Sequence, residues 1–265
     1  MNRFLILLVT VCFLGCSGEK SGDDKSSDSG KDNPGGTATA DSKKPSRGET
    51  DSGSGSRVRT ENFFGRGKEM NDMNKLKIIG LAMHNFHDVY RKFATAPLPE
   101  KSELRHPSLS WRVSLLPYVE LANEYEQFDR KQPWDSAQNK ALVGGKGKEP
   151  FVLSNGNLIC NIKCENQAKA FRDILDGSSN TVMLLENPTA DGDKWTQTVD
   201  ITDKDAVKIV KSLKKGEYLL ALMYDGSTTR IHSTEGKNLS DEDIMAVFGH
   251  RDGTITKQEI FQPSK

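Results

Sequence analysis

The chain has 265 residues, of which only 35% are hydrophobic, and its mean hydropathy is −0.61. These values are low for a protein that is compact throughout, so part of the chain must lie outside any hydrophobic core. Lys plus Arg and Asp plus Glu each number 37, which leaves no net charge to concentrate nucleic acid or an acidic substrate. We therefore predict no nucleic-acid partner.

The N-terminus has the pattern of an exported protein. A positively charged start precedes an apolar run over residues 4–14, which is shorter than the roughly twenty residues needed to span a bilayer. We interpret residues 1–15 as a signal peptide. The run ends in Phe-Leu-Gly-Cys, which resembles the lipobox of bacterial lipoproteins and predicts acylation of Cys16. Ordinary secretion, with cleavage near residue 15 or 18, is the alternative.

The next segment, residues 17–60, is rich in Ser, Gly, Asp and Lys and contains Val58 but little else that is apolar. Such a segment cannot bury enough surface to offset its ordering entropy, so we predict a flexible linker. We assign residues 16–62 to the lipidated cysteine and this linker, and residues 63–265 to one globular domain. Ser17 follows the cysteine where aspartate often marks inner-membrane retention, which favours an envelope location on the outer membrane.

The clearest helical pattern in the chain runs over residues 73–90. Its apolar residues follow one another at steps of three and four, which places them on one helix face: Met73, Leu76, Ile79, Met83, Phe86 and Tyr90. We assign the polar residues to the opposite face: Asp72, Asn74, Lys75, Lys77, Asn85 and Asp88. The pattern predicts a surface helix that lies on a core, and two nearby prolines, Pro97 and Pro99, are expected to end it.

Shorter elements follow. Residues 110–116 predict a strand or a short helix, residues 119–128 a helical segment, and the glycine-rich residues 144–149 a mobile loop. Asn155-Gly156 between two apolar runs predicts a hairpin.

The C-terminal half alternates strands with capped helices. Residues 176–180 predict a turn into a buried strand at 181–185, and residues 218–224 and 228–232 predict two strands joined by Asp-Gly-Ser. Thr202 and Ser240 are each followed three residues on by Asp, which predicts two helix starts, and we expect the second helix to end at Gly249. The expected fold class is α+β: one N-terminal amphipathic helix packed on a mainly antiparallel sheet, with two short additional helices.

Several of these segments also form a recognisable series. They are residues 74–88, 110–120, 132–135 with 139–140, 174–181 with Glu186, 195–196 and 225–227. Together they resemble a bacterial prepilin-type family of unknown function, which is named for a C-terminal signature of His, nine residues and Asp-Gly, and is also filed among solute-binding-like domains. The resemblance implies a pilin-like α+β fold and no established reaction.

The family-motif positions in this chain are His84, Asn85, His87, Asp88, Asp176, Gly177, Asn180, Glu186, Asp225 and Gly226. Two departures are visible. A lipoprotein signal and a linker replace the leader and long apolar helix typical of the family, and Lys215 stands where the signature has His.

The best candidates for chemistry are His84 and His87, which lie one helical turn apart and could share a metal ion with Asp88 or a distant third ligand. The alternative is that both imidazoles fix the helix end by hydrogen bonding. No other His or Cys cluster supports a site, so we predict structural histidines, no metal and no cofactor. Residues 248–259 imitate half of an EF-hand loop, but they lack the first carboxylates that calcium needs.

Aromatic and sulfur-containing residues give two further candidate sites. Trp111, Trp134 and Trp195 could form an aromatic ligand-binding surface, although tryptophans in a domain of this size more often anchor the core and loops. Cys160 and Cys164 could form a disulfide in an exported protein. A helix would hold their Cβ atoms about 6 Å apart, too far for the bond, whereas an irregular or hairpin segment could close it.

These patterns lead to one hypothesis of function and one alternative. The first is a lipid-anchored envelope protein whose non-catalytic, pilin-like domain binds an envelope protein partner, with the membrane contacted through the lipid. The alternative is an extracytoplasmic solute-binding or ligand-binding module that uses the tryptophans and loops. None of the standard catalytic constellations is present in the sequence, which argues against an enzyme.

Overall fold

The structure is a computed structural model, and it describes residues 57–60, 65–96, 108–165, 167–248 and 258–263. All of these residues belong to one compact unit, Gly53–Lys265. The α-helices are α1 (Arg66–Tyr90), α2 (Trp111–Leu115), α3 (Ala122–Gln127), α4 (Ala137–Ala141), α5 (Asp203–Lys211) and α6 (Asp241–Met245). The strands are β1 (Arg59–Thr60), β2 (Asn157–Lys163), β3 (Val182–Asp191), β4 (Ile201–Thr202), β5 (Glu217–Met223) and β6 (Thr228–His232). The expected α+β class is confirmed.

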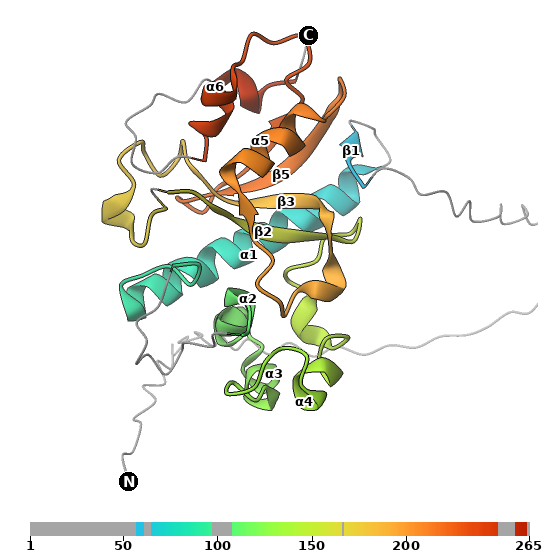
Figure 1. Ribbon diagram of the computed structural model, residues 1–265, viewed down its shortest axis with the longest axis vertical. Coiled ribbons are helices and arrows are strands. Elements are labelled where there is room, and N and C mark those ends of the chain that lie inside the picture. The colour runs from blue at the N-terminus through green and yellow to red at the C-terminus, as the bar shows by residue number, and fades with distance from the viewer. Residues whose placement is uncertain (1–56, 61–64, 97–107, 166, 249–257, 264–265) are drawn as a thin grey trace, which may run out of the picture. The chain divides into compact units, whose positions relative to one another are not determined.

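The six strands form one curled, mainly antiparallel sheet. Its order is β1-β5-β3-β2-β4, and β6 pairs with β5. Among the strands that the structure describes, β2 and β4 form the one parallel pair. Figure 1 shows α1 running along the sheet, with the short helices α2, α3 and α4 grouped together beyond it. Within the described residues, no helix is both long and apolar enough to cross a membrane.

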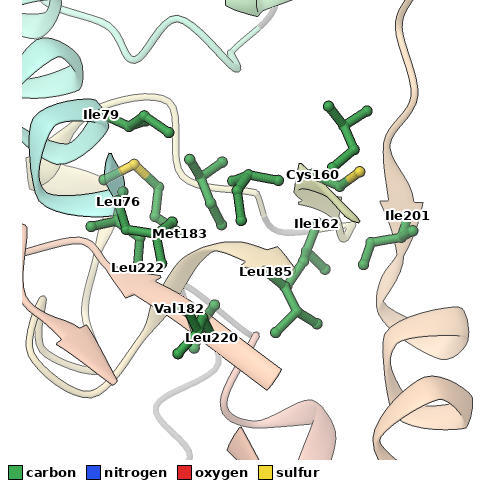
Figure 2. Packing of buried hydrophobic residues seen from close by; sticks show 14 of the residues in the cluster. Leu76, Ile79, Cys160, Ile162, Val182, Met183, Leu185, Ile201, Leu220 and Leu222 are labelled. Carbon is green, nitrogen blue, oxygen red and sulfur yellow. The ribbon is translucent and has the colours of Figure 1, made fainter. Parts of the chain in front are cut away.

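The core lies between α1, the sheet and α5. Six consecutive residues of β5, Tyr218–Met223, are buried, which is the pattern of a strand covered on both faces. Figure 2 shows Leu76 and Ile79 of α1 pointing toward the strands on one side, while Ile201 and the helix that follows it lie on the other side. The amphipathic pattern of α1 therefore places its apolar face where the sequence predicts.

The helix differs from the prediction at its start and at two residues: Tyr90, predicted on the apolar face, is exposed, and Asp72, predicted in solvent, is buried. Leu76, Ile79, Met83 and Phe86 are fully buried, but so is Asp72, which the sequence places on the solvent face. Asp72 is buried because Arg59, which lies before the helix and 13 residues away in the sequence, pairs with it, as described below. The helix begins at Arg66 rather than near Met73, and it ends at Tyr90, because Arg91 adopts a left-handed conformation and its amide bonds to the His87 carbonyl.

The predicted turns and caps are confirmed in their details. Gly177 and Gly226 have φ of 92° and 85°, as residues of tight turns that favour glycine do. The side chain of Thr202 accepts a hydrogen bond from the amide of Asp205, and Ser240 with Asp243 forms a reciprocal capping box. Gly156 also has a positive φ, in the tight turn that leads into β2.

Of the two alternatives for residues 110–116, the short helix is confirmed: Ser110 caps α2 at its N-terminus. Two local expectations are corrected. Residues 144–149 contain a 3-10 turn at Lys146–Lys148, in which Gly147 is buried. Helix α6 ends at Met245, before the predicted Gly249, and Gly249 itself lies outside the described residues.

Structure also begins earlier than predicted. Residues 57–60, inside the segment assigned to the linker, include β1, whose Arg59 and Thr60 pair with Tyr218 and Glu217 of β5. Val58 packs against the hydrophobic core. The domain boundary therefore lies before residue 57 and not at residue 63.

Candidate functional site

Three of the family-motif residues, His84, His87 and Glu186, belong to two polar clusters inside the domain. One cluster, which we call the ion node, consists of Arg59, Asp72 and Glu186 with Ser154, Asn155 and Asn157 around them. The other, the histidine cluster, consists of His84, His87, Phe93, Phe171 and Tyr224. Both clusters connect α1 to parts of the chain that are remote from it in sequence.

The ion node forms where strand β5 changes its partner. Residues 221–223 of β5 pair with β3, whereas Tyr218 and Glu217 pair with β1. Between the two pairings the amide of Leu220 donates to Glu186 Oε2 at 2.9 Å. The side chain of Glu186 thus replaces a backbone partner at the point where β3 leaves β5.

Arg59 connects both buried carboxylates of the node. Its Nε lies 2.8 Å from Glu186 Oε2, and its Nη2 lies 2.7 Å from Asp72 Oδ2. Desolvation opposes the charge of Arg59, but its contacts with Glu186 and Asp72 outweigh this cost and raise the pKa of the guanidinium. The Arg59 side chain is 9% exposed and both carboxylates are fully buried. Each charge is therefore paired in a setting where an unpaired charge would be costly.

Polar side chains from the turn before β2 and from the first residue of β2 complete the node. Ser154 donates to Asp72 through its amide, at 2.9 Å, and through its hydroxyl, at 2.5 Å. Asn155 and Asn157 donate to Glu186 Oε1 at 2.6 and 2.7 Å, and each also contacts the carbonyl of Arg57. The node thereby fixes residues 57–60, α1, β2, β3 and β5 to one another.

The histidine cluster holds the second half of α1. His84 donates from Nε2 to the Tyr224 carbonyl at 2.9 Å, just before the turn at Gly226. His87 Nε2 accepts from the amide of Phe171 at 3.5 Å, and its ring contacts Phe93 and Phe171 at centroid distances of 5.0 and 4.7 Å. Burial is the main cause that lowers the pKa of His87, so its imidazole favours the neutral form.

The histidines bond differently from the expectation that they fix the helix end to the loop that follows. Their partners, Tyr224 and Phe171, lie more than eighty residues further along the chain. Within the described residues no group of three or more His, Cys, Asp or Glu side chains is arranged to hold a metal ion. The EF-hand-like segment, residues 248–259, lies mostly outside those residues.

The two glycine turns of the family motif are joined by their backbones. The amide of Asp225 donates to the Ser178 carbonyl at 3.0 Å. In one turn Asn180 donates to the carbonyl of Asp176, and in the other Asp225 accepts from the amide and the hydroxyl of Ser227. These motif residues therefore shape and connect turns. The remaining two, Asn85 and Asp88, lie on the exposed face of α1.

The three tryptophans do not share one exposed surface. Trp195 is fully buried, stacks parallel to Phe151 and donates from Nε1 to the Val143 carbonyl at 2.8 Å. Trp111 is also buried and meets the edge of Phe151, whereas Trp134 is half-buried. A cavity of about 130 Å³ reaches Trp195, but its lining includes neither Trp111 nor Trp134. That volume is below the roughly 300 Å³ typical of ligand sites.

The two cysteines remain thiols in the structure. Cys160 lies inside β2 and Cys164 directly after it. An extended strand separates residues four positions apart by about 13 Å, which a disulfide cannot span. Cys164 instead donates from Sγ to the Phe248 carbonyl at 3.7 Å, and burial raises the pKa of the Cys160 thiol.

Sequence reasoning missed the fully buried Arg112. Its guanidinium donates mainly to backbone carbonyls, including that of Ile159 at 2.5 and 3.0 Å and that of Val199 at 3.2 Å. Desolvation is the main cause that lowers its pKa. Arg59 was missed for a different reason, since its neighbours led us to assign it to a linker. The alternation of Val58, Arg59 and Thr60, although short, is the signal that could have identified the strand.

A larger cavity lies at the other end of the sheet. It has a volume of about 630 Å³ and is lined by the turn before β5, the loop after β6 and the C-terminal segment 258–263. Lys215, the residue at the position of the family's signature histidine, lies on its wall. Lys237 is also part of the wall and donates from Nζ to the carbonyls of Glu259 and Gln262 at 2.8 and 2.5 Å.

Comparison with known families gives one match. Residues 68–160 and 161–251 match a family described as protein of unknown function (DUF1559), which is filed as solute-binding-like. The chain belongs to this family. The match covers α1 from residue 68, the whole sheet except β1, and both clusters apart from Arg59. No curated protein and no solved structure matches the chain. The lipidation candidate Cys16 precedes both the matched region and the described residues.

Proposed function

We propose that this DUF1559 protein is a lipid-anchored protein of the cell envelope whose folded domain is a non-catalytic, pilin-like interaction module for an envelope protein. The observation that carries the proposal is the attachment of residues 57–60 to the core. Arg59 enters the sheet as part of β1 and bonds to two buried carboxylates, one from α1 and one from β3.

This attachment suits a tethered domain. In the proposal the acylated Cys16 holds the membrane, residues 17–56 span the distance, and β1 is the first element of the fold. Any pull on the tether then acts on β5 and on the ion node rather than on a loosely packed end. As a flexible coil, a linker of this length reaches roughly 40 Å, enough to hold the domain clear of the lipid surface.

The contacts of the motif residues support a role in the fold rather than in a reaction. His84 and Asn180 bond to backbone groups at turns, and Glu186 bonds to the β5 amide at the point where that strand changes its partner. A catalytic acid, base or nucleophile would need to meet a substrate in a cleft instead. We therefore expect these motif positions to preserve the shape of the module.

The anchor is tested on protein isolated from membranes. Mass spectrometry of the mature N-terminus should find a diacylglycerol-modified Cys16, and fractionation should place the protein with the outer membrane. Cys16→Ser should release the domain from the membrane without changing its thermal unfolding. An unmodified N-terminus beyond residue 16 in the wild type would exclude the lipid anchor.

Partner binding is tested separately by cross-linking in intact cells. The tethered wild type should give a discrete cross-linked species with another envelope protein, and the same species should be lost when exposed residues on the domain are changed. Cross-links that form equally with unrelated envelope proteins would argue against a specific partner.

The 630 Å³ cavity favours a second candidate function, the binding of a small polar solute. Its volume lies within the range of about 300–1,000 Å³ that is usual for ligand sites. Both charge signs are present on its wall, from Lys215, Lys237, Glu235 and Glu259. Such a wall suits a small zwitterion or a polyhydroxylated solute better than an apolar one.

A thermal-shift screen tests this candidate. A panel of amino acids, sugars and dicarboxylates is added to the wild type and to a Lys215→Ala variant. A binding solute should raise the melting temperature of the wild type more than that of the variant. If no solute raises the melting temperature of the wild type, the binding function is excluded for that panel.

A further inference from the structure

Helix α1 carries an apolar stripe on the face that points away from the sheet. Met70, Ile78, Leu81 and Val89 are 66, 52, 62 and 61% exposed. Asn74 and Asn85, also exposed, lie between them. At 100° per residue, these six positions fall within an arc of about 100° along roughly 28 Å of the helix. We call this set of six residues the α1 stripe.

The stripe reads the same in both directions. Starting from either end, its order is a large apolar residue, an asparagine and a large apolar residue, at steps of four, with a step of three at the centre. Each residue is matched by one of the same character at a mirror position: Met70 with Val89, Asn74 with Asn85, and Ile78 with Leu81. Asn71 and Asp88, beside the stripe, are matched in the same way.

Such symmetry is what a contact between two identical helices requires. In a two-fold dimer the same patch occurs on both sides, so the surface must be complementary to itself. When two copies of α1 run antiparallel about the midpoint between Ile78 and Leu81, apolar residues meet apolar residues. Asn74 meets Asn85 of the other copy, where two amides can exchange hydrogen bonds and fix the register.

We propose that the α1 stripe is the contact surface of an antiparallel homodimer of this chain. The stripe of one copy therefore contacts the α1 helix of a second copy, and the two helix dipoles point in opposite directions. The stripe with Asn71, Lys77 and Asp88 provides nine residues a side, whereas a stable interface uses about 20–30. The pairing is therefore weak in dilute solution.

The charges beside the stripe set the salt dependence of the pairing. Lys77 and Asp88 cancel within one copy, so no net charge on this face opposes the contact. At the two ends, however, Lys68 of one copy comes opposite Arg91 of the other. Salt screens this repulsion and leaves the apolar contact in place. Association through the stripe should therefore tighten as the salt concentration rises.

Tethering would concentrate the domains. Two domains held at one membrane surface meet at a higher effective concentration than free ones. This last step rests on the proposed lipid anchor, whereas the pairing itself does not. The test therefore uses the chain without its lipid, so that failure of the pairing and failure of the anchor remain distinguishable.

The experiment is sedimentation equilibrium of residues 16–265 carrying Cys16→Ser, up to about 1 mM, with reductant present. The wild-type sequence should show a monomer–dimer equilibrium that tightens as salt is raised. Leu81→Asp places a charge opposite Ile78 and should weaken the dimer at least about tenfold. Leu175→Asp is the matched control, because Leu175 is 66% exposed but lies outside α1, and it should change the dimer less than about twofold.

A charge-swap variant tests the register. In Ile78→Lys/Leu81→Asp, the antiparallel pairing brings each Lys opposite an Asp of the other copy, so association should recover from the loss seen in Leu81→Asp alone. A wild type that remains monomeric at about 1 mM, or equal effects of Leu81→Asp and Leu175→Asp, would overturn the dimer. A double variant no better than Leu81→Asp would overturn the proposed antiparallel contact. Circular dichroism melts confirm that each variant is folded.

Discussion

At the residue scale, the fold depends on a few buried charges that are satisfied by partners from distant parts of the chain. Arg59 is the clearest case, since it pairs with carboxylates 13 and 127 residues away. A single arginine of this kind does not form a recognisable sequence pattern, because its partners lie far from it in the sequence. Its removal is nevertheless costly, because the groups that it neutralises remain buried.

Replacement of Arg59 by Ala should therefore lower the free energy of unfolding by about 3–5 kcal/mol, the usual cost of breaking a buried ion pair. The control is Arg57→Ala in the same segment. Arg57 is exposed and takes part in the node through its backbone carbonyl, so this change should cost less than about 0.5 kcal/mol. Urea unfolding of both variants measures the difference. Similar losses in the two variants would show that the Arg59 ion pairs add no net stability.

His87 should make stability depend on pH. Burial lowers its pKa in the folded state below the usual value of about 6.5, so the unfolded chain takes up the proton first as pH falls. This contribution is complete above pH of about 6.5 and is lost as pH falls from there toward the lowered pKa. Protonation would also place a hydrogen on Nε2, where the amide of Phe171 now donates.

The measurement is urea unfolding of the wild type and of His87→Gln at several pH values from about 7 to 5. The difference in unfolding free energy between them should shrink as pH falls, because the variant lacks the group that titrates. Taking this difference removes the contributions of the many carboxylates that both proteins share. Parallel curves across the range would contradict the role assigned to His87.

Residues of this kind mark the limit of sequence reasoning. The periodicity of α1 placed Leu76, Ile79 and Met83 correctly, since apolar burial follows a local repeat. The same repeat placed Asp72 in solvent, because nothing near it in the sequence indicates that Arg59 reaches it. The polar contacts of the candidate clusters join residues tens of positions apart, and no local rule predicts them.

At the element scale, prediction was most successful where a residue type determines the backbone. The glycine turns and the Thr202 and Ser240 caps were all located, because each depends on the chemistry of only three or four neighbouring residues. Glycine content alone was misleading at residues 144–149. Gly147 is buried against Trp195, and a Cβ on it would lie 2.7 Å from that side chain, so only glycine allows this close packing.

The turn between β5 and β6 should be sensitive to the contact between Gly226 and His84. Gly226 has a φ of 85°, and a Cβ there would lie 3.2 Å from His84 Cε1. Gly216 has a similar φ of 83° but nothing within 4 Å. Both Gly→Ala changes incur the left-handed penalty of about 1–2 kcal/mol. Gly226→Ala should cost about 1 kcal/mol more, since it also disturbs the bond from His84 to Tyr224.

Thermal or urea unfolding of the two alanine variants compares them directly. Because the backbone penalty is common to both, the difference reports the packing of α1 against the turn. Equal destabilisation would mean that His84 moves aside freely and that the histidine cluster does not hold this end of the helix.

At the scale of the whole molecule, one strand of the sheet, β1, lies outside the region that the family model matches. The matched region begins at residue 68, after β1, so this strand comes from the N-terminal segment outside the match. It fills the position beside β5 that β3 leaves at Glu186. In this chain the matched region contains two buried carboxylates, Asp72 and Glu186, and Arg59 from outside that region pairs with both.

Two deletions test whether β1 belongs to the domain. Removal of residues 17–52 leaves the compact unit Gly53–Lys265 intact and should not change the free energy of unfolding. Removal of residues 17–60 takes away β1 and the guanidinium between Asp72 and Glu186, and should lower it by about 3–5 kcal/mol. Both chains are compared with the wild type by urea unfolding. Because the longer deletion extends the shorter one by only eight residues, a loss confined to the longer deletion assigns the stability to residues 53–60. An equal loss in both would place the boundary of the domain before residue 53.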